Sequence, residues 1–241
     1  TIKVITLAGI AIILFSTTLC TSCATVGNSV ESFHAIHRDE APVDAFVLVH
    51  VEQKLIPAGC ASDNPDTDCA EILSSLPTLE NTISGSGLLV QSDAGPSILT
   101  AEHVCERKAP SALEHAGVKI AIKNEVKIQV ISPMRGTFNA SIIRKNEKLD
   151  LCLLQPSRVF TNPVKIAVTS PKIGDKVYAV AAPFGISGEG LALIFDGYFS
   201  GKNEGSTFYT IPTKPGSSGS SVLNEDYEVV GVIWAAFRSI E

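Results

Sequence analysis

The sequence predicts an all-β protein made of two six-stranded antiparallel β-barrels that pack together. Three observations lead to this fold class. Twelve short runs of strand-forming residues recur along the chain, and Gly, Pro and Asn separate them. Outside the N-terminal segment, no long stretch shows the periodicity of a helix. Of the 241 residues, 45% are hydrophobic and 18% charged, which is enough apolar material for such a core.

Residues 1–24 differ in kind from the rest of the chain. Val4–Leu19 is apolar or small, Lys3 precedes it, and no acidic residue occurs before Glu31. The run is shorter than the roughly 20 residues of a membrane-spanning helix, and it is typical of the apolar region of a secretory signal. We therefore expect an exported protein, located in the periplasm or outside the cell.

Three fates of this signal stay open. Ser22-Cys23-Ala24 fits a small-x-small cleavage site, which would release a chain that begins at Thr25. Alternatively, Leu19–Cys23 resembles a bacterial lipoprotein signal, in which Cys23 would carry the lipid and attach the protein to a membrane. The third alternative is an uncleaved anchor.

The twelve runs fall into two sets within residues 45–241, after a polar linker over residues 25–44. The first barrel is expected over residues 45–156, from the runs Ala45–Glu52, Gly85–Gln91, Ser97–Ala101, Glu125–Ile131, Thr137–Ile143 and Asp150–Gln155. The second is expected over about residues 163–237, from Val164–Val168, Lys176–Ala182, Leu191–Ser200, Thr207–Ile211, Ser220–Asn224 and Val229–Ala236. Pro156–Pro163 is the expected join.

The insert Lys54–Ile83 is expected to be a long surface loop. It carries Cys60 and Cys69, which bracket a stretch rich in Asp, Asn, Pro, Ser and Thr. In an oxidising compartment we expect a disulfide to close that stretch. A metal site would need more ligands than the stretch offers. One short helix is expected within Cys69–Leu76 and another from Ala101.

Three short segments carry, in chain order, a histidine, an aspartate and a glycine-flanked serine. Serine alone is a poor nucleophile near neutral pH, so it needs an imidazole to take its proton and a carboxylate to orient that imidazole. These residue types therefore indicate a nucleophilic triad. The segments are Thr100-Ala101-Glu102-His103, Leu149-Asp150-Leu151-Cys152-Leu153-Leu154 and Pro215-Gly216-Ser217-Ser218-Gly219-Ser220.

The serine segment is the most specific of the three. Gly216 lies two positions before Ser218, and Gly219 follows it directly. Glycine permits the tight turn that directs successive backbone N–H groups into one concavity. The N–H groups of Gly216 and Ser218 would then stabilise the oxyanion of a tetrahedral intermediate. The competing interpretation is an ordinary Gly/Ser hairpin.

His103 and Asp150 each have a simpler alternative. His103 follows a strand-like run and could be a surface histidine at a strand end. Asp150 precedes an apolar run, where a buried carboxylate needs a partner, and it could also be an exposed edge residue. Cys105 and Cys152 lie close to these two residues in sequence. They could form a disulfide or remain two buried thiols.

The three segments resemble those of chymotrypsin-fold serine proteases, in particular the bacterial HtrA/Deg (trypsin-like) branch. They are similar to that branch's Thr-Ala-x-His, Asp-Leu-Ala-Leu-Leu and Pro-Gly-Asn-Ser-Gly-Gly segments. The resemblance covers about Ala45–Ala236. It is supported by Ser84-Gly85-Ser86-Gly87-Leu88-Leu89-Val90, by Ile173-Gly174-Asp175-Lys176-Val177 and by Pro183-Phe184-Gly185.

This resemblance implies a serine endopeptidase with its active site in the cleft between the barrels. Ser218 would attack the peptide carbonyl, His103 would act as general base and then general acid, and Asp150 would orient His103. The expected substrates are proteins or peptides, and the reaction proceeds through an acyl-enzyme. The resemblance implies no metal and no cofactor.

The chain departs from the branch pattern at three places. Ser217 replaces Asn or Asp before the nucleophile, and Ser220 replaces the second glycine after it. The branch's PDZ module and C-terminal helix are not among the 241 residues. A minimal enzyme and a truncated sequence therefore stay open as alternatives.

The resemblance also indicates where substrate would bind. It places Pro212 at the base of the pocket for the residue before the scissile bond, and Ile233, Trp234 and Ala235 along the pocket wall. Because no acid stands at Pro212, we do not expect a preference for Lys or Arg. Small or medium apolar residues are expected instead.

Two other functional classes compete with a peptidase. The first is a catalytically inactive binding protein that keeps the protease fold. The second is an ester hydrolase, but strand-like residues follow Ser218, whereas a helix follows the nucleophile elbow of that class. The net charge of −6 argues against nucleic acid as a partner. The sequence predicts no oligomeric state.

Overall fold

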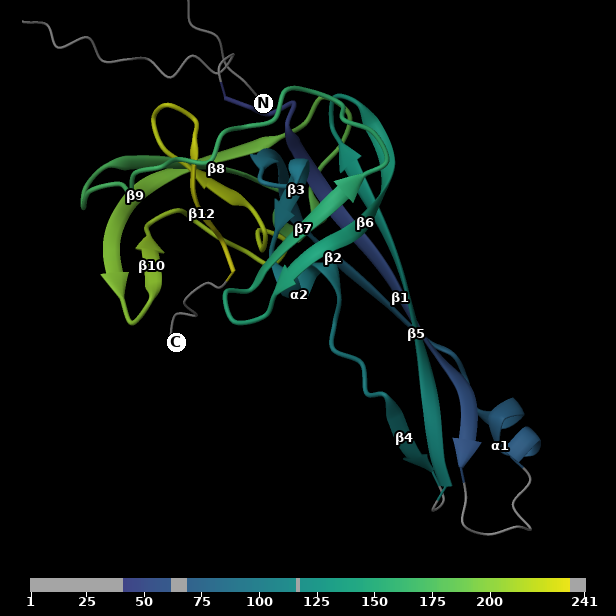
Figure 1. Cartoon of the computed structure of the whole chain (residues 1–241). Coiled ribbons are helices and arrows are strands. Elements are labelled where there is room, and N and C mark those ends of the chain that lie inside the picture. The colour runs from purple at the N-terminus through teal and green to yellow at the C-terminus, as the bar shows by residue number, and fades with distance from the viewer. Residues whose placement is uncertain (1–40, 62–68, 116–117, 235–241) are drawn as a thin grey trace, which may run out of the picture. The chain divides into compact units, whose positions relative to one another are not determined.

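The structure is a computed structural model that describes residues 41–61, 69–115 and 118–234. These residues belong to one compact unit, Asp39–Glu241. They form a seven-stranded and a five-stranded antiparallel sheet, shown in Figure 1. The predicted all-β class with two barrel-like sheets is therefore confirmed. The expected signal over residues 1–24, its Cys23 and most of the linker lie outside the described residues.

The first sheet closes on itself. Its strand order is β1-β2-β3-β7-β6-β5-β4, and β1 also pairs with β5, so that six of its strands form a barrel. β4 pairs with the first part of β5. Each of the six runs predicted for the first barrel overlaps one of the six closing strands. The strands are β1 (Phe46–Ala61), β2 (Leu79–Ser92), β3 (Gly95–Thr100), β4 (Ala112–His115), β5 (Val118–Ser132), β6 (Gly136–Asn146) and β7 (Leu151–Pro156).

The expected surface loop over Lys54–Ile83 is wrong at both of its ends. β1 continues to Ala61 and stays paired with β5, while β2 already begins at Leu79. The predicted helix within this insert is confirmed as α1 (Cys69–Ser75), which lies near the far end of β1 in Figure 1. Val118 and Ile120 of β5 are buried in this extension. Alternate apolar residues therefore give it a face to pack, which favours strands over a loop.

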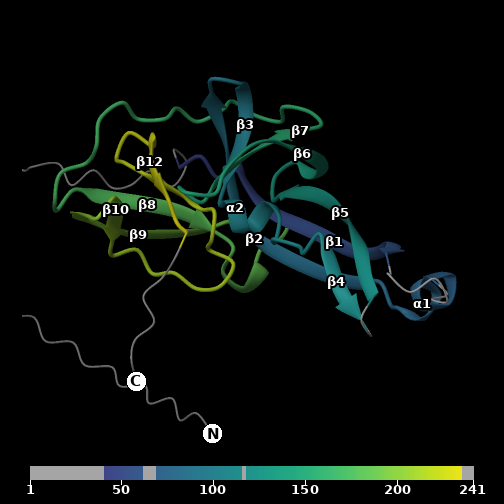
Figure 2. The same cartoon turned by 60° about the horizontal axis from the view of Figure 1, so that its bottom comes forward.

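The second sheet has five strands among the described residues, in the order β10-β9-β8-β11-β12. Each of these strands overlaps one of the runs predicted for the second barrel. Figure 2 shows this sheet beside the first. The strands are β8 (Lys176–Ala181), β9 (Leu193–Asn203), β10 (Ser206–Tyr209), β11 (Ser221–Leu223) and β12 (Val229–Val232).

The sixth strand predicted for this barrel, Val164–Val168, does not form. The Val164 N–H donates to the Leu89 carbonyl of the first sheet, whereas the Ala167 N–H donates to the Val229 carbonyl of the second. The segment divides its backbone hydrogen bonds between two sheets, so it connects them instead of adding to either. This explains why an apolar run with strand-like composition gives only isolated bridges.

β8 contributes side chains to two apolar clusters, one on each of its faces. Val177 and Ala179 of this strand pack with residues inside the second sheet. The alternating residues Tyr178 and Val180 belong instead to the cluster that fills the first barrel. Because successive side chains of a strand point to opposite faces, β8 is buried on both sides. This packing holds the two sheets against one another, together with the segments that follow their strands.

Candidate active site

His103 lies on α2 (Glu102–Cys105), a single helical turn directly after β3. The two residues that follow it, Val104 and Cys105, are buried in the core and anchor the turn. His103 itself is exposed. The short helix predicted to start at Ala101 is confirmed, with Ala101 as its N-cap residue.

Asp150 holds this turn through three hydrogen bonds. Its Oδ2 lies 2.7 Å from His103 Nδ1, and its Oδ1 accepts from the His103 backbone N–H at 3.0 Å. Its carbonyl oxygen accepts from the Glu102 N–H at 3.1 Å. Because an ionised carboxylate can only accept, this pairing calls for the proton on Nδ1. The Nε2 lone pair of His103 is then available to a neighbouring proton donor.

The backbone of Asp150 is in the left-handed region, with φ of 50°. Aspartate tolerates this region better than most residues. The preceding turn supports it, because the Leu149 N–H donates to Asn146 Oδ1 and the Asp150 N–H donates to the Glu147 carbonyl. This conformation lets the carboxylate and the carbonyl of Asp150 face the same helical turn.

The segment that carries Ser218 requires both of its glycines. Gly216 and Gly219 have φ of +95° and +87°. A Cβ at Gly216 would overlap the Ala182 carbonyl oxygen, at the end of β8. A Cβ at Gly219 would overlap Thr100 Oγ1 and the Ser86 carbonyl oxygen, next to the start of α2. The two glycines therefore allow the Ser218 turn to contact both sheets.

The backbone N–H groups around Ser218 divide into two kinds. The N–H groups of Ser217 and Gly219 donate to the carbonyls of Lys214 and Ile233. Within the described parts of the chain, the N–H groups of Gly216 and Ser218 donate to no protein acceptor. These two N–H groups are therefore free to donate hydrogen bonds to a ligand.

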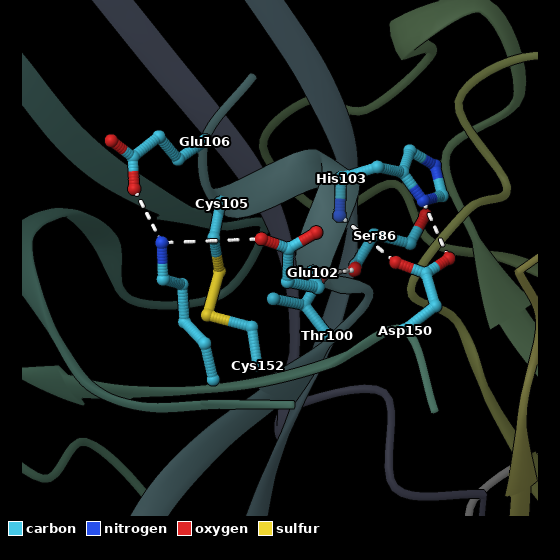
Figure 3. The surroundings of a disulfide bond; sticks show 9 residues. Ser86, Thr100, Glu102, His103, Cys105, Glu106, Asp150 and Cys152 are labelled. Carbon is cyan, nitrogen blue, oxygen red and sulfur yellow. Dashed lines mark hydrogen bonds and ion pairs between the residues drawn. A yellow bond between two sulfur atoms is a disulfide. The ribbon is translucent and has the colours of Figure 1, made fainter. Parts of the chain in front are cut away.

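The structure joins the three predicted residues to different degrees. His103 and Asp150 are in direct contact, as Figure 3 shows. Ser218 approaches them through Gly85, whose missing side chain leaves room for both Val104 of α2 and the Ser218 carbonyl oxygen, 2.6 and 2.8 Å from an ideal Cβ. In the described structure no hydrogen bond joins the Ser218 hydroxyl to the His103 ring. Such bonds are often long without substrate.

Serine occupies both unusual positions of the Ser218 turn, and the buried hydroxyl of Ser220 has no hydrogen-bond partner in the part of the chain that the structure describes. Ser217 is buried, and its hydroxyl accepts a hydrogen bond from the Lys214 N–H at 3.3 Å. Ser220 is fully buried, and its N–H donates to the Ser217 carbonyl. The turn therefore keeps its hydrogen-bonded form with serine at both positions.

A disulfide lies directly behind the His103–Asp150 pair. Cys105 and Cys152 are bonded, and each lies two residues after a member of that pair (Figure 3). This decides between the two alternatives that the sequence leaves open. Cys60 is also disulfide-bonded. The Cys69 side chain lies outside the described residues, so its pairing with Cys60 stays a prediction.

One lysine links β6 to the helical turn. The Lys145 ammonium lies 2.6 Å from Glu106 Oε2 and 3.9 Å from Glu102 Oε1. The hydrogen bond to Glu106 and the charge of both glutamates raise the pKa of Lys145, against the opposing effect of burial. The α2 turn is therefore held on one side by Asp150 and on the other by Lys145.

The residues predicted for the substrate pocket lie in different settings. Ile233 and Trp234 line a cavity of about 550 Å³ together with β10 and Thr213, and none of the lining side chains that the structure describes is charged. Pro212 is exposed and is not among the lining residues. Ala235 lies outside the described residues. The involvement of β10 in this cavity is not apparent from the sequence.

Sequence reasoning gives Ser86 no role. In the structure it is fully buried and bonds to Gly216 and Ser218. The sequence shows only a polar residue between two glycines, in a segment that resembles the protease branch, and Gly216 lies 130 residues away from it.

No helix among the described residues is long and apolar enough to cross a membrane. No group of three or more His, Cys, Asp or Glu side chains among them is arranged to hold a metal ion.

Residues 85–232 match the family model of the trypsin-like peptidase domain. The fold is similar to the serine endoprotease from Yersinia pestis, with a TM-score of 0.53 and 20% sequence identity over 83% of this chain. The match spans only 56% of that longer chain. No curated protein matches the sequence. The matched residues include all three segments described above, and the chain belongs to the trypsin-like peptidase domain family.

Proposed function

We propose that the protein is an exported serine endopeptidase that uses His103, Asp150 and Ser218. The observation that carries this proposal is the 2.7 Å contact between His103 Nδ1 and Asp150 Oδ2. It fixes the tautomer and the orientation that a general base for serine requires. Membership of the peptidase family supports the same chemistry.

In the proposed acylation step, the Ser218 oxygen attacks the carbonyl carbon of a peptide bond. The Ser218 proton passes to His103 Nε2, and the ionised Asp150 stabilises the resulting imidazolium. The N–H groups of Gly216 and Ser218 stabilise the negative charge on the former carbonyl oxygen. The intermediate then collapses, His103 gives its proton to the leaving amine, and the C–N bond breaks.

Deacylation repeats these steps with water. His103 takes a proton from the attacking water, which adds to the acyl carbon of the ester formed with Ser218. When this second intermediate collapses, the proton returns to the Ser218 oxygen and the carboxylic acid leaves. Every proton moves between Ser218, His103 and the reactants.

The cavity beside Trp234 supports a preference for uncharged side chains before the scissile bond. Burying a cation without a charged partner is costly, and no acidic side chain lines the cavity among the residues that the structure describes. We therefore propose small or medium apolar residues at that substrate position. Two features support export: the pattern of residues 1–24 and the Cys105–Cys152 disulfide, which is typical of oxidising compartments.

Digestion of an unfolded protein, followed by mass-spectrometric mapping of the new termini, tests this function. The proposal predicts internal cleavage after small or medium apolar residues and no cleavage by Ser218→Ala. Cleavage that persists in Ser218→Ala would contradict the assigned nucleophile. A folded wild-type protein that cleaves nothing would favour the alternative of an inactive binding protein.

A further inference from the structure

Ser86 is a fully buried residue at the meeting point of the two sheets. Four hydrogen bonds use all of its polar groups. Its N–H donates to the Ser218 carbonyl at 2.7 Å, and its hydroxyl donates to the Gly216 carbonyl at 2.8 Å. The same hydroxyl accepts from the Ala182 N–H at 2.9 Å, and the Ser86 carbonyl accepts from Thr100 Oγ1 at 2.7 Å.

These partners come from three separate segments. Gly216 and Ser218 form the nucleophile turn, Ala182 follows β8, and Thr100 ends β3. Thr100 lies three residues before His103, and its bond to Ser86 is drawn in Figure 3. Ser86 therefore connects the segment of the candidate nucleophile to the segment of the candidate base.

The hydrogen bonds to Ser86 restrain one of the unused N–H groups, that of Ser218. The peptide unit that carries the Ser218 N–H lies between two others, whose carbonyls belong to Gly216 and Ser218. Both carbonyls are bonded to Ser86. Rotation of the central peptide unit would disturb one or both of these bonds, so Ser86 restrains the direction of the Ser218 N–H.

The surroundings of Ser86 leave no room for a water molecule that could replace its hydroxyl. A Cβ on the neighbouring Gly85 would lie 2.8 Å from the Ser218 carbonyl oxygen, and one on Gly87 would lie 2.9 Å from Ile98 Cγ2. Both Ser86 and Ala182 are fully buried. Loss of the hydroxyl would leave the Ala182 N–H without its partner, and water has no access to replace it.

We propose that Ser86 is a positioning residue for the peptidase reaction. It aligns the oxyanion-binding N–H groups of Gly216 and Ser218 and sets their place relative to His103. This inference rests on the function proposed above, because it assumes that Ser218 is the nucleophile. Ser86 contacts no reacting atom and acts only through the turn that it holds.

The test compares Ser86→Ala with Ser97→Ala on a peptide substrate. Ser97 is a matched control because it is fully buried in β3 and its hydroxyl also donates to a backbone carbonyl, that of Gly95, at 3.0 Å. Misalignment of catalytic groups by about 1 Å can cost about 100-fold in rate. We expect Ser86→Ala to lower kcat about 100-fold with KM unchanged. We expect Ser97→Ala to keep the wild-type kcat even if both variants lose stability.

The pH dependence separates this role from damage to the His103–Asp150 pair. Ser86→Ala should keep the wild-type apparent pKa of kcat/KM, because both bonds of that pair remain. If Ser86→Ala keeps kcat within about twofold, or loses activity only in proportion to its unfolded fraction, the positioning role is overturned.

Thr100 provides a second test if Ser86→Ala fails to fold. Thr100→Val keeps the shape of the side chain and removes the bond to the Ser86 carbonyl, whereas Thr100→Ser keeps that bond. We expect Thr100→Val to lower kcat and Thr100→Ser to keep kcat near the wild-type value. Equal kcat values for the two variants would overturn the proposal. A wild-type protein without turnover overturns the proposed function itself. An active wild type with an equally active Ser86→Ala overturns only the positioning role.

Discussion

His103 and Asp150 are joined twice, once through the imidazole and once through the peptide backbone. Nδ1 lies 2.7 Å from Oδ2, and the His103 N–H donates to Oδ1 at 3.0 Å. The carboxylate therefore fixes the ring and the start of its helical turn together. Cys105 and Cys152 repeat this connection two residues further along both segments, and each pair is 47 residues apart in sequence.

Asp150→Asn should abolish most of the activity while the protein stays folded. An amide places an N–H group where Nδ1–H needs an acceptor, so the ring would turn or change tautomer. We expect kcat to fall about 10⁴-fold, the loss known for this change in serine proteases. Asp93→Asn is the control, because Asp93 is an exposed partner of Arg144. Steady-state kinetics check both variants, and an Asp150→Asn enzyme with near-wild-type kcat would contradict the role of Asp150.

Removal of the Cys105–Cys152 disulfide should weaken the fold and loosen the site. The bond closes a loop across 47 residues of sequence. Loop-closure entropy then gives a stabilisation of up to about 4 kcal/mol. In urea titrations, we expect the free energy of unfolding of the double variant Cys105→Ala, Cys152→Ala to be lower than that of the wild type by most of this contribution. An unchanged midpoint and slope would show that the disulfide does not stabilise the folded state.

Gly219→Ala should be far more damaging than a glycine substitution elsewhere with the same backbone angle. Gly219 and Gly136 have φ of +87° and +83°. A Cβ at Gly136 has no atom within 4 Å, whereas one at Gly219 overlaps Thr100 Oγ1 and the Ser86 carbonyl oxygen. We expect Gly136→Ala to cost about 1–2 kcal/mol for its backbone conformation alone, and Gly219→Ala to cost more and to lose activity. Similar losses in thermal unfolding would contradict the close approach at Gly219.

The Lys145 ion pairs should stabilise the α2 turn only while Lys145 is charged. Glu106 raises the pKa of Lys145 above its ordinary value of 10.5. A raised lysine pKa contributes stability that is complete below pH 10.5 and disappears as the pH rises through the folded-state value. Because the Lys145 side chain is one-third exposed, we expect the free energy of unfolding of the wild type to exceed that of Lys145→Met by about 0.5–1 kcal/mol at pH 8. In urea unfolding from pH 8 to pH 11, this difference in unfolding free energy should shrink above pH 10.5. A difference that grows above pH 10.5 would contradict the stabilising role of the Lys145 ion pairs.

Local pattern located the six closing strands of the first barrel, but it missed how far β1 and β2 extend into the Lys54–Ile83 insert and how the two sheets are connected. In β5 the buried Ile128 and Val130 alternate with the polar Lys127 and Gln129, and this alternation is visible in the sequence. Val164–Val168 has a similar composition, yet its hydrogen bonds go to two different sheets. The length of the Lys54–Ile83 insert predicts a surface loop, whereas in the structure its first part pairs with β5, far along the chain, and its last part pairs with β1. Composition does not encode which partner a strand finds.

In the candidate site, too, some residues could be predicted from the sequence and others could not. His103, Asp150 and Ser218 could be chosen from the sequence because a histidine, an aspartate and a glycine-flanked serine follow in that order, in segments that resemble those of the protease branch. Ser86 could not, because a serine in an apolar strand has meaning only through the turn that folds against it. The Cys105–Cys152 pairing likewise depends on β3 and β7 being neighbours in the sheet. Residue chemistry therefore predicts which groups react, whereas tertiary contacts show which residues hold them in place.

Labelling with a fluorophosphonate probe tests the central claim most directly, because the probe reacts with a serine only where a base and an oxyanion site are assembled around it. The purified protein, Ser218→Ala and His103→Ala would be labelled side by side, and the modified residue located by mass spectrometry. We predict a single modified residue in the wild type, Ser218, and no labelling in either variant. A folded wild-type protein that is not labelled, or labelling that persists in Ser218→Ala, would contradict the assignment of Ser218 as the nucleophile.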